Sequence, residues 1–304
     1  MSERIKLDLR TFEEEVMTAE DPTAVFQKYF ESTEGASPFQ ADVKLKESVE
    51  VEGGEAGFID WMDLVNKLMT RKRKRKYKSL RKDHPEFTVV VSEGDSWFQH
   101  PLIKDTIEHL YHSHAILSLG AAGDEIIDMV KKGQYLDAIR EEQPEVFLVS
   151  GGGNDVLGEP LASMLEPWFE DDGRGPARIV NQNLPAKLEE IVQAYHTLVD
   201  QVRAINPDLK IVIHSYDYVI PRDGGKYLGK KMADKQIHEK TEQQDIMKYI
   251  IDTYFDTLKS KVANLEGVVL SDHRGIVASN KWFDEIHPSR DGFKEVAKKF
   301  RTYM

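Results

Sequence analysis

The sequence predicts an α/β protein whose core is a parallel β-sheet. Short runs rich in β-branched and apolar residues recur along the chain from residue 87 onward. Each run is apolar almost throughout, which is typical of strands that are buried on both faces. Stretches with helical periodicity separate the runs, and this alternation favours a parallel sheet with right-handed crossovers. The expected strands are 87–92, 114–119, 145–150, 209–215 and 267–272.

Residues 85–304 are therefore expected to form one three-layer α/β/α sandwich around a five-stranded parallel sheet. Its helices are predicted at 102–113, 125–142 and 184–204. Two further connections, 156–182 and 221–245, are longer than ordinary strand-to-helix loops. Insertions at the C-terminal edge of a parallel sheet usually shape a site, so 156–182 is a candidate lid.

The preceding residues, 1–84, are charged and irregular, and we predict a mainly helical N-terminal extension there. Thr11 and the glutamates that follow it form an N-cap signature. Residues 58–69 have the apolar spacing of a helix. Between Glu34 and Gly57, glycine, serine and proline interrupt any period, which predicts a loop.

The composition is that of a globular protein, but the charge is distributed unevenly. Of the 304 residues, 40% are hydrophobic and 31% are charged, and the net charge is −12. This acidic balance argues against nucleic acid as a partner. Residues 71–82, in contrast, contain nine basic residues and no acidic one. They form either a solvated face of a helix or a patch for an anionic membrane or another partner.

The chain contains no cysteine, which excludes disulfides, thiolate nucleophiles and cysteine-ligated zinc. Its first residues lack the apolar segment of a secretory signal, and no apolar run approaches the roughly 20 residues of a transmembrane helix. We therefore expect a cytoplasmic protein. The sequence does not indicate an oligomeric state.

Small and polar residues gather where the predicted strands end. Ser96 lies in a Gly-Asp-Ser turn after the first strand, where backbone N–H groups and a helix N-terminus could stabilise an oxyanion. The glycine-rich segment 118–126 follows the second strand. Asn154 follows three glycines after the third strand, and its amide could donate to a developing negative charge. Each segment alone is also compatible with an ordinary turn.

Asp284 and His287, near the C-terminus, complete a set suited to nucleophilic catalysis. Their spacing of three would let them face the same way on one helical turn. A serine nucleophile needs a base beside its hydroxyl and a carboxylate that orients the base. The pair could also hold a metal or form a salt bridge, but a base and its orienting group fit the serine and the asparagine loop better.

These four segments resemble, in order, the four motifs of the SGNH (GDSL) hydrolase family of serine esterases and lipases. The resemblance covers residues 89–300 and implies a flavodoxin-like α/β/α fold and ester hydrolysis without cofactor or metal. It implies Ser96 as nucleophile, His287 as base and Asp284 as the residue that orients His287. The oxyanion hole would comprise the N–H groups of Ser96 and Gly123 and the side chain of Asn154, with Asp95 and Asp155 as supporting residues.

Two features depart from the family pattern. The aromatic residues Trp97 and Phe98 follow the serine, where they could line an acyl pocket or pack the helix. The extension 1–84 is not needed by the family core. The natural substrate is therefore open. We expect a lipid or lysophospholipid ester, and the alternative is deacetylation of a carbohydrate.

Other classes of protein fit less well. The nucleophile elbow of the general α/β-hydrolases, GxSxG, would require a second glycine where Phe98 stands. Residues 224–231 nearly match a phosphate-binding loop, but Lys231 replaces its hydroxyl residue. His112 and His114 could be metal ligands, although no carboxylate–histidine set accompanies them. A non-catalytic binding module on the same fold is the remaining alternative.

Overall fold

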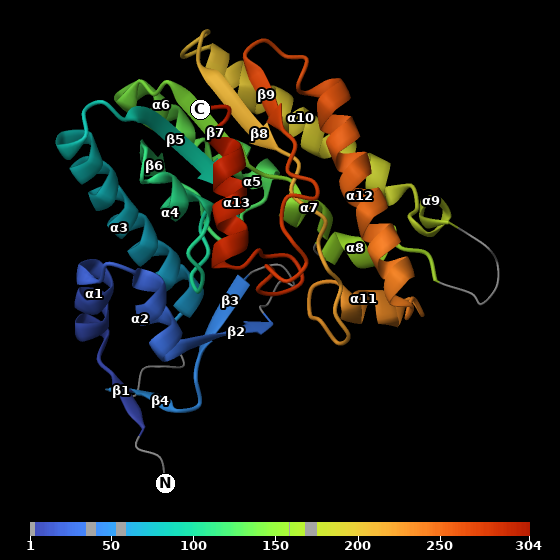
Figure 1. Ribbon diagram of the computed structural model, residues 1–304, viewed down its shortest axis with the longest axis horizontal. Helices are drawn as coiled ribbons and strands as arrows, with labels where there is room; N and C mark the ends of the chain where they lie inside the picture. The colour runs from blue at the N-terminus through green and yellow to red at the C-terminus, as the bar shows by residue number, and fades with distance from the viewer. Residues whose placement is uncertain (1–3, 35–40, 53–58, 158, 168–174) are drawn as a thin grey trace.

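The computed structural model describes residues 4–34, 41–52, 59–157, 159–167 and 175–304. A five-stranded parallel sheet forms its centre, in the order β6-β5-β7-β8-β9 (Figure 1). The strands are β5 (Thr88–Gly94), β6 (His114–Ser118), β7 (Val146–Ser150), β8 (Lys210–His214) and β9 (Val268–Ser271). All five predicted strands are confirmed. This order is that of flavodoxin-like doubly wound sheets, in which ligands bind at the carboxyl ends of the strands.

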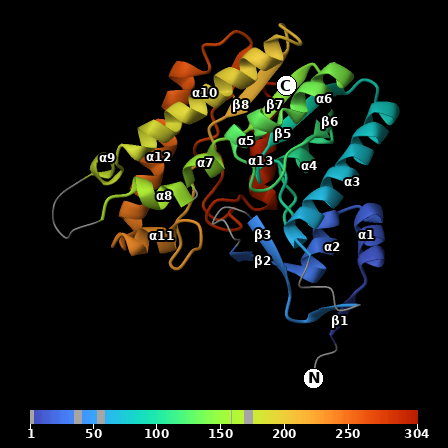
Figure 2. The same cartoon turned by 180° about the vertical axis from the view of Figure 1, so that it is seen from behind.

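Helices cover both faces of the sheet and complete the predicted three-layer sandwich. One face carries α4 (Thr106–Leu110), which packs against α13 (Arg290–Phe300). The opposite layer centres on α10 (Asn183–Arg203), which contacts the other helices of that layer. These are α5 (Ile126–Lys132), α6 (Gln134–Glu142) and α12 (Lys240–Lys261). Figure 2 shows α10 running along the length of this second layer.

Two predicted helices differ from the structure in their extent. The helix expected at 125–142 is divided into α5 and α6, because Gly133 adopts a left-handed conformation with φ +60° between them. The helix expected at 102–113 is reduced to α4, since Asp105 caps its first turn by accepting from the N–H of Glu108. The helix expected at 184–204 is confirmed as α10.

The two long connections also contain short helices. Within 156–182 lie the end of α7 (Gly153–Leu157), then α8 (Glu159–Met164) and α9 (Pro176–Ile179). Residues 158 and 168–174 lie outside the described residues, so the lid remains a prediction. The connection 221–245 contains α11 (Gly229–Asp234) and the first turns of α12.

The N-terminal residues form a small α+β unit beside the sandwich (Figure 1). Its helices α1 (Leu9–Thr18) and α2 (Pro22–Tyr29) precede an antiparallel pair, β2 (Phe30–Glu34) and β3 (Ala41–Leu45). The parallel pair β1 (Ile5–Leu7) and β4 (Val49–Val51) closes the unit. Two expectations are therefore wrong. The loop expected at 34–57 contains β3 and β4, and α1 is capped by Asp8, whose carboxylate accepts from the N–H of Thr11, not by Thr11 itself.

The long helix α3 (Trp61–Asp83) connects this unit to the sheet. Asp60 caps it, and Phe58, which the sequence places in the same helix, lies outside the described residues. Its first half packs with α1 and α2 in a small apolar core, whereas Tyr77 and Leu80 join the core of the sheet. The boundary predicted at 84/85 coincides with the end of α3, but this helix belongs to both cores.

No helix in the described part of the chain has the length and apolar character needed to cross a membrane.

Candidate active site

Ser96, His287 and Asp284 lie together at the carboxyl end of the sheet. Ser96 lies two residues after the end of β5, and the other two residues come from the loop before α13. The Ser96 Oγ lies 2.8 Å from His287 Nε2, and His287 Nδ1 lies 2.8 Å from Asp284 Oδ2. All three side chains are mostly or wholly shielded from solvent. The structure thus brings together the nucleophile, base and orienting carboxylate named from the sequence.

The loop 283–289 holds the aspartate and the histidine in a turn, so the helical turn considered for them is wrong. The Asp284 Oδ1 accepts from the N–H groups of Ile286 at 3.0 Å and His287 at 2.8 Å. Burial alone would raise the pKa of Asp284, but His287, His100 and the N–H of Ile286 together hold that pKa well below its usual range. An ionised Asp284 accepts the Nδ1 proton of His287, which leaves Nε2 free to accept the proton of Ser96.

Glu285, buried beside this pair, fixes the loop to the segment 222–229. Its carboxylate accepts from four backbone N–H groups, at 2.7–3.0 Å. The donors are Arg222, Tyr227, Leu228 and Gly229. A Cβ on Gly225 would lie 2.1 Å from the Glu285 carboxyl carbon, so only glycine fits there. The segment that resembled a phosphate loop therefore binds a carboxylate of its own chain.

The turn that carries Ser96 is held by Asp95. This buried carboxylate accepts from the N–H of Trp97 at 3.0 Å and from the Ser150 hydroxyl at 2.8 Å. It also accepts from the Tyr216 hydroxyl at 2.5 Å. Burial raises the pKa of Asp95, although these donors act in the opposite direction. Asp95 thus fixes the backbone on both sides of the serine.

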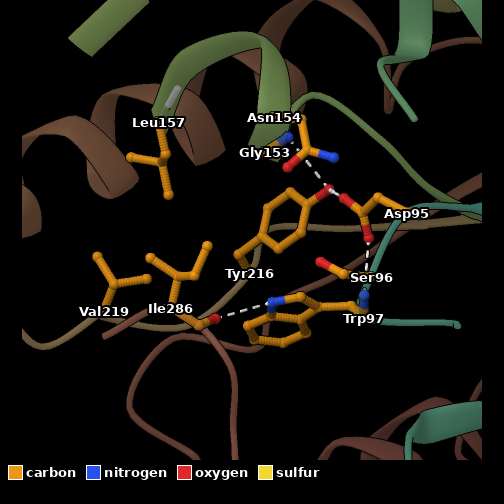
Figure 3. A pocket seen from close by; sticks show the side chains of 9 residues that line it. All are labelled: Asp95, Ser96, Trp97, Gly153, Asn154, Leu157, Tyr216, Val219 and Ile286. Carbon is orange, nitrogen blue, oxygen red and sulfur yellow. Dashed lines mark hydrogen bonds between the residues drawn. The ribbon is translucent and has the colours of Figure 1, made fainter. Parts of the chain in front are cut away.

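Tyr216 joins this turn to the glycine loop that precedes Asn154. Its hydroxyl donates to Asp95 and accepts from the N–H of Gly153 at 3.1 Å (Figure 3). A Cβ on Gly153 would lie 2.8 Å from the Tyr216 ring, so glycine permits this close approach. Tyr216 itself has φ +60°, an uncommon conformation for a residue with a side chain. Tyr216 lies outside the four motifs, although its place just after β8 is a signal, since the other motifs also follow strands.

Asn154 and the second motif meet on the other side of the serine. The Asn154 Nδ2 donates to the Asp124 carbonyl at 2.9 Å, which uses one of its two hydrogens. Gly120 packs against β5, where a Cβ would lie 2.6 Å from the Gly94 carbonyl oxygen. Gly123 has φ +91°, which favours glycine. The backbone N–H groups of Ser96 and Gly123 have no hydrogen-bond partner among the described residues.

Asp155, the second supporting residue named from the sequence, fixes the start of α5. Its Oδ2 accepts from the N–H of Ile126 at 3.0 Å. Burial raises the pKa of Asp155 to about 7, although this hydrogen bond acts in the opposite direction. The third motif is thereby attached to the helix that follows the second one.

A narrow apolar pocket of about 20 Å³ opens beside Ser96 (Figure 3). It is lined by Asp95, Ser96, Trp97, Gly153, Asn154, Leu157, Tyr216, Val219 and Ile286. The Trp97 indole forms one wall and donates to the Ile286 carbonyl at 3.1 Å. Phe98, in contrast, packs against Phe300 and does not line the pocket. Of the two aromatic residues considered for an acyl pocket, only Trp97 lines this pocket.

His100 lies against His287 and was not identified from the sequence. Its ring meets the His287 ring edge to face, with centroids 4.6 Å apart. Burial and the neighbouring His287 hold the pKa of His100 well below its usual value. Together with Asp284, these histidines offer three ligand atoms within 4.8 Å of one another. Hydrogen bonds already occupy both His287 nitrogens, both Asp284 oxygens and the His100 Nδ1, so a metal would have to displace several of them.

The other histidine pair weighed as metal ligands lies elsewhere. His112 is exposed, whereas His114 is buried at the start of β6. The His114 Nδ1 lies 2.8 Å from the Ser113 hydroxyl. The metal-site geometry found among the described residues involves neither of them.

Arg73, within the basic run, supports the segment after Ser96. Its guanidinium is 1% exposed, binds the Phe98 carbonyl and lies 2.5 Å from Asp105 Oδ2. Asp105 also accepts from the N–H of His100 at 2.9 Å. Burial raises the pKa of Asp105 to about 6, against the opposing effect of Arg73. The basic run is therefore not a uniformly solvated face, since one of its cations is part of the core.

No family model matches the sequence. No curated protein matches it. Among solved structures, the chain is similar to an extracellular lipase from Streptomyces rimosus, with 12% identity, a TM-score of 0.44 and coverage of 71% of this chain and 100% of that one. It is similar to a carbohydrate esterase family 3 protein from Talaromyces cellulolyticus, with 14% identity, a TM-score of 0.38 and coverage of 71% and 96%. A third structure, from Streptococcus pneumonia and named for platelet activating factor, has 14% identity, a TM-score of 0.47 and coverage of 80% and 94%.

At this level of identity the similarity concerns the fold alone. The strand order and the placement of the motifs at one edge of the sheet come from the chain itself. The chain has the flavodoxin-like α/β/α fold that the sequence predicted, with the strand order β6-β5-β7-β8-β9.

Proposed function

We propose that this protein hydrolyses carboxylic esters through an acyl-enzyme formed on Ser96. The observation that carries the proposal is the chain of hydrogen bonds from Ser96 through His287 to Asp284, each 2.8 Å long. It supplies an activated hydroxyl, a base within reach of its proton and an anion that stabilises the protonated base.

In the proposed reaction, Ser96 Oγ attacks the ester carbonyl carbon while His287 Nε2 takes the hydroxyl proton. The negative oxygen would be stabilised by the N–H groups of Ser96 and Gly123 and by the Asn154 amide. As the tetrahedral intermediate collapses, His287 returns the proton to the departing alcohol. Water, deprotonated by His287, then attacks the acyl-enzyme, and the carboxylic acid leaves Ser96 with its hydroxyl restored.

The pocket favours a short acyl group. Its volume of about 20 Å³ is little more than a single water molecule needs. Leu157, Val219 and Ile286 close it on the side away from Ser96 (Figure 3). We therefore place acetyl and similarly short esters, including O-acetylated carbohydrates, before the lipid or lysophospholipid esters expected from the sequence.

The class of reaction is tested by covalent labelling and by turnover. Wild-type protein should react with a fluorophosphonate probe and hydrolyse aryl acetate, whereas Ser96→Ala should do neither. His287→Ala should lose turnover by several orders of magnitude. Full activity in Ser96→Ala would disprove the assignment. A wild-type protein that neither reacts with the probe nor hydrolyses any ester would favour a non-catalytic binding module.

The acyl preference is tested by a series of aryl esters from two to ten carbons. We expect kcat/KM to fall steeply beyond about four carbons. Each methylene that the pocket cannot accommodate should cost roughly 1–3 kcal/mol of transition-state binding. Val219→Ala should extend the accepted length, and Val199→Ala, which shortens a buried valine outside the pocket, is the matched control. A rate that holds or rises with chain length in the wild type would favour the lipid substrate.

A further inference from the structure

Two adjoining grooves on the face formed by α3, α4 and α13 concentrate positive charge. The larger one lies between α3 and α4 and has a volume of about 410 Å³. The smaller one lies between α4 and α13 and has a volume of about 170 Å³. Lys104 and His112 line both grooves, so the two are continuous.

The charge of this surface is opposite to that of the molecule. Eight of its lining residues are lysine or arginine and three are acidic, in a chain of net charge −12. The cations come from segments far apart in sequence and converge here. They are Lys72, Arg73, Arg75, Lys76, Lys104, Arg290, Lys294 and Arg301. The basic run noted in the sequence is thus one side of a larger feature.

Most of these cations are not used to stabilise the fold. Arg73 is paired with Asp105, and the Lys72 ammonium donates to the Ala19 carbonyl. The side chains of the other six make no ion pair or hydrogen bond with another described residue. Tyr111, which is 5% exposed and lines the larger groove, has a buried hydroxyl without a partner in the described part of the chain. Buried hydroxyls are usually hydrogen-bonded, so an unpartnered one beneath the groove is unusual.

We propose that the grooves together form a binding site for a soluble oligophosphate anion. Two connected concave sites, each lined by cations, fit a ligand with several linked phosphate groups better than a single phosphate. The surface lacks the apolar anchor that stable membrane contact requires. Among the described residues, the exposed large apolar side chains are Ile5 and Phe283, and neither lines a groove. This site is independent of the proposed esterase function.

Calorimetric titration of the full chain with tripolyphosphate at low ionic strength tests the proposal. We expect saturable binding with Kd below about 1 mM that weakens as salt is added. Lys76→Gln/Lys104→Gln should weaken binding roughly tenfold or more, since each lysine removed takes away a charged hydrogen-bond donor to phosphate. The matched control, Lys78→Gln/Lys82→Gln, removes two exposed cations of the same run outside the grooves and should change Kd less than about twofold.

Three outcomes would overturn the proposal. The first is a failure of tripolyphosphate to saturate the wild type. The second is an equal loss of affinity in the two double variants, which would indicate a general charge effect. The third is sedimentation of the protein with phosphatidylserine vesicles while tripolyphosphate neither binds nor competes, which would assign the surface to a membrane. Urea unfolding of both double variants shows whether any loss of binding reflects loss of folded protein.

Discussion

Single hydroxyl and carboxyl groups decide how the loops of the site are held. Tyr216 joins Asp95 to Gly153, and Glu285 joins the 283–289 loop to the segment 222–229. Neither residue needs to touch a substrate for its loss to matter, because the geometry of Ser96 and Asp284 depends on them. Catalytic groups have to be held within a fraction of an ångström of their productive positions.

Asn154 provides a direct test of the oxyanion hole at this scale. Asn154→Ala should lower kcat by about 10²–10³, equivalent to roughly 2.7–4 kcal/mol, with little change in KM, because the lost donor acts mainly in the transition state. Steady-state kinetics on aryl acetate measure both constants. Asn181→Ala, which removes an asparagine amide outside the pocket, is the control. An unchanged kcat in Asn154→Ala would remove this residue from the oxyanion hole.

Glu93 predicts a pH dependence of stability. It is 3% exposed, and burial raises its pKa from 4.5 to about 8. The pKa of Glu93 is higher in the folded than in the unfolded chain. Its protonation therefore contributes to the free energy of unfolding in full below pH 4.5, and this contribution is lost as pH rises towards 8. Glu93→Gln keeps the shape but cannot ionise. Its unfolding free energy should therefore exceed that of the wild type increasingly as pH rises, by at most about 1.4 kcal/mol per pH unit.

Urea unfolding at pH 5.5 and pH 8 measures this difference. Other groups titrate in the same range, so only the change between wild type and variant is interpreted. Glu86→Gln, at an exposed position nearby, should show no such trend. A difference that stays constant across the range would contradict the buried, protonated state of Glu93.

At the scale of an element, the side chains of α3 serve both the surface and the core. Its exposed cations face solvent and the grooves, whereas Arg73 enters the core and binds the segment between Ser96 and α4. The helix is thus a structural part of the α/β/α sandwich as well as of the N-terminal unit. The inward direction of this single arginine could not be read from the composition of the run.

Loss of Arg73 should destabilise the protein strongly. Arg73→Gln leaves Asp105 buried without its cation and should lower the free energy of unfolding by roughly 3–5 kcal/mol. Lys74→Gln, its exposed neighbour on the same helix, should change it by less than about 0.5 kcal/mol. Urea unfolding followed by far-UV circular dichroism measures both values. Equal effects of the two substitutions would mean that the buried pair does not contribute to stability.

At the scale of the whole molecule, the two apolar cores are connected. The N-terminal core includes Leu102 and Ala122, which belong to loops beside the active site, and α3 enters both cores. The chain should therefore unfold as one cooperative unit. Its lack of cysteine allows a simple test with single introduced thiols.

Val65→Cys reports on the N-terminal core and Ala115→Cys on the sheet, since both side chains are fully buried. Their thiols should become reactive at the same urea concentration, because the two cores share a helix. Thiol labelling across a urea series measures the two midpoints, and circular dichroism of each variant controls for altered stability. An earlier midpoint in the Val65→Cys variant would instead indicate that the N-terminal unit opens separately.

Much of this architecture could be predicted because the signals are local. The five strands follow from continuous apolar runs, and the proposed catalytic residues stand in short motifs at strand ends. What could not be predicted depends on partners distant in sequence: Tyr216 bonds Asp95 across 121 residues, and Glu285 finds its donors 56–63 residues away. The strands β3 and β4 could not be predicted, because strands of only five and three residues carry little periodicity.

The three proposed catalytic residues differ in when they can meet as the chain folds. Asp284 and His287 are three residues apart, so their turn can form early from local contacts. Ser96 is 191 residues from His287 and reaches it only after the sheet and α13 have packed. Contacts between distant parts of a chain form late, because closing a long loop lowers the entropy of the chain before the contacts stabilise it. Recovery of serine reactivity during refolding would thus mark the completion of the whole sandwich.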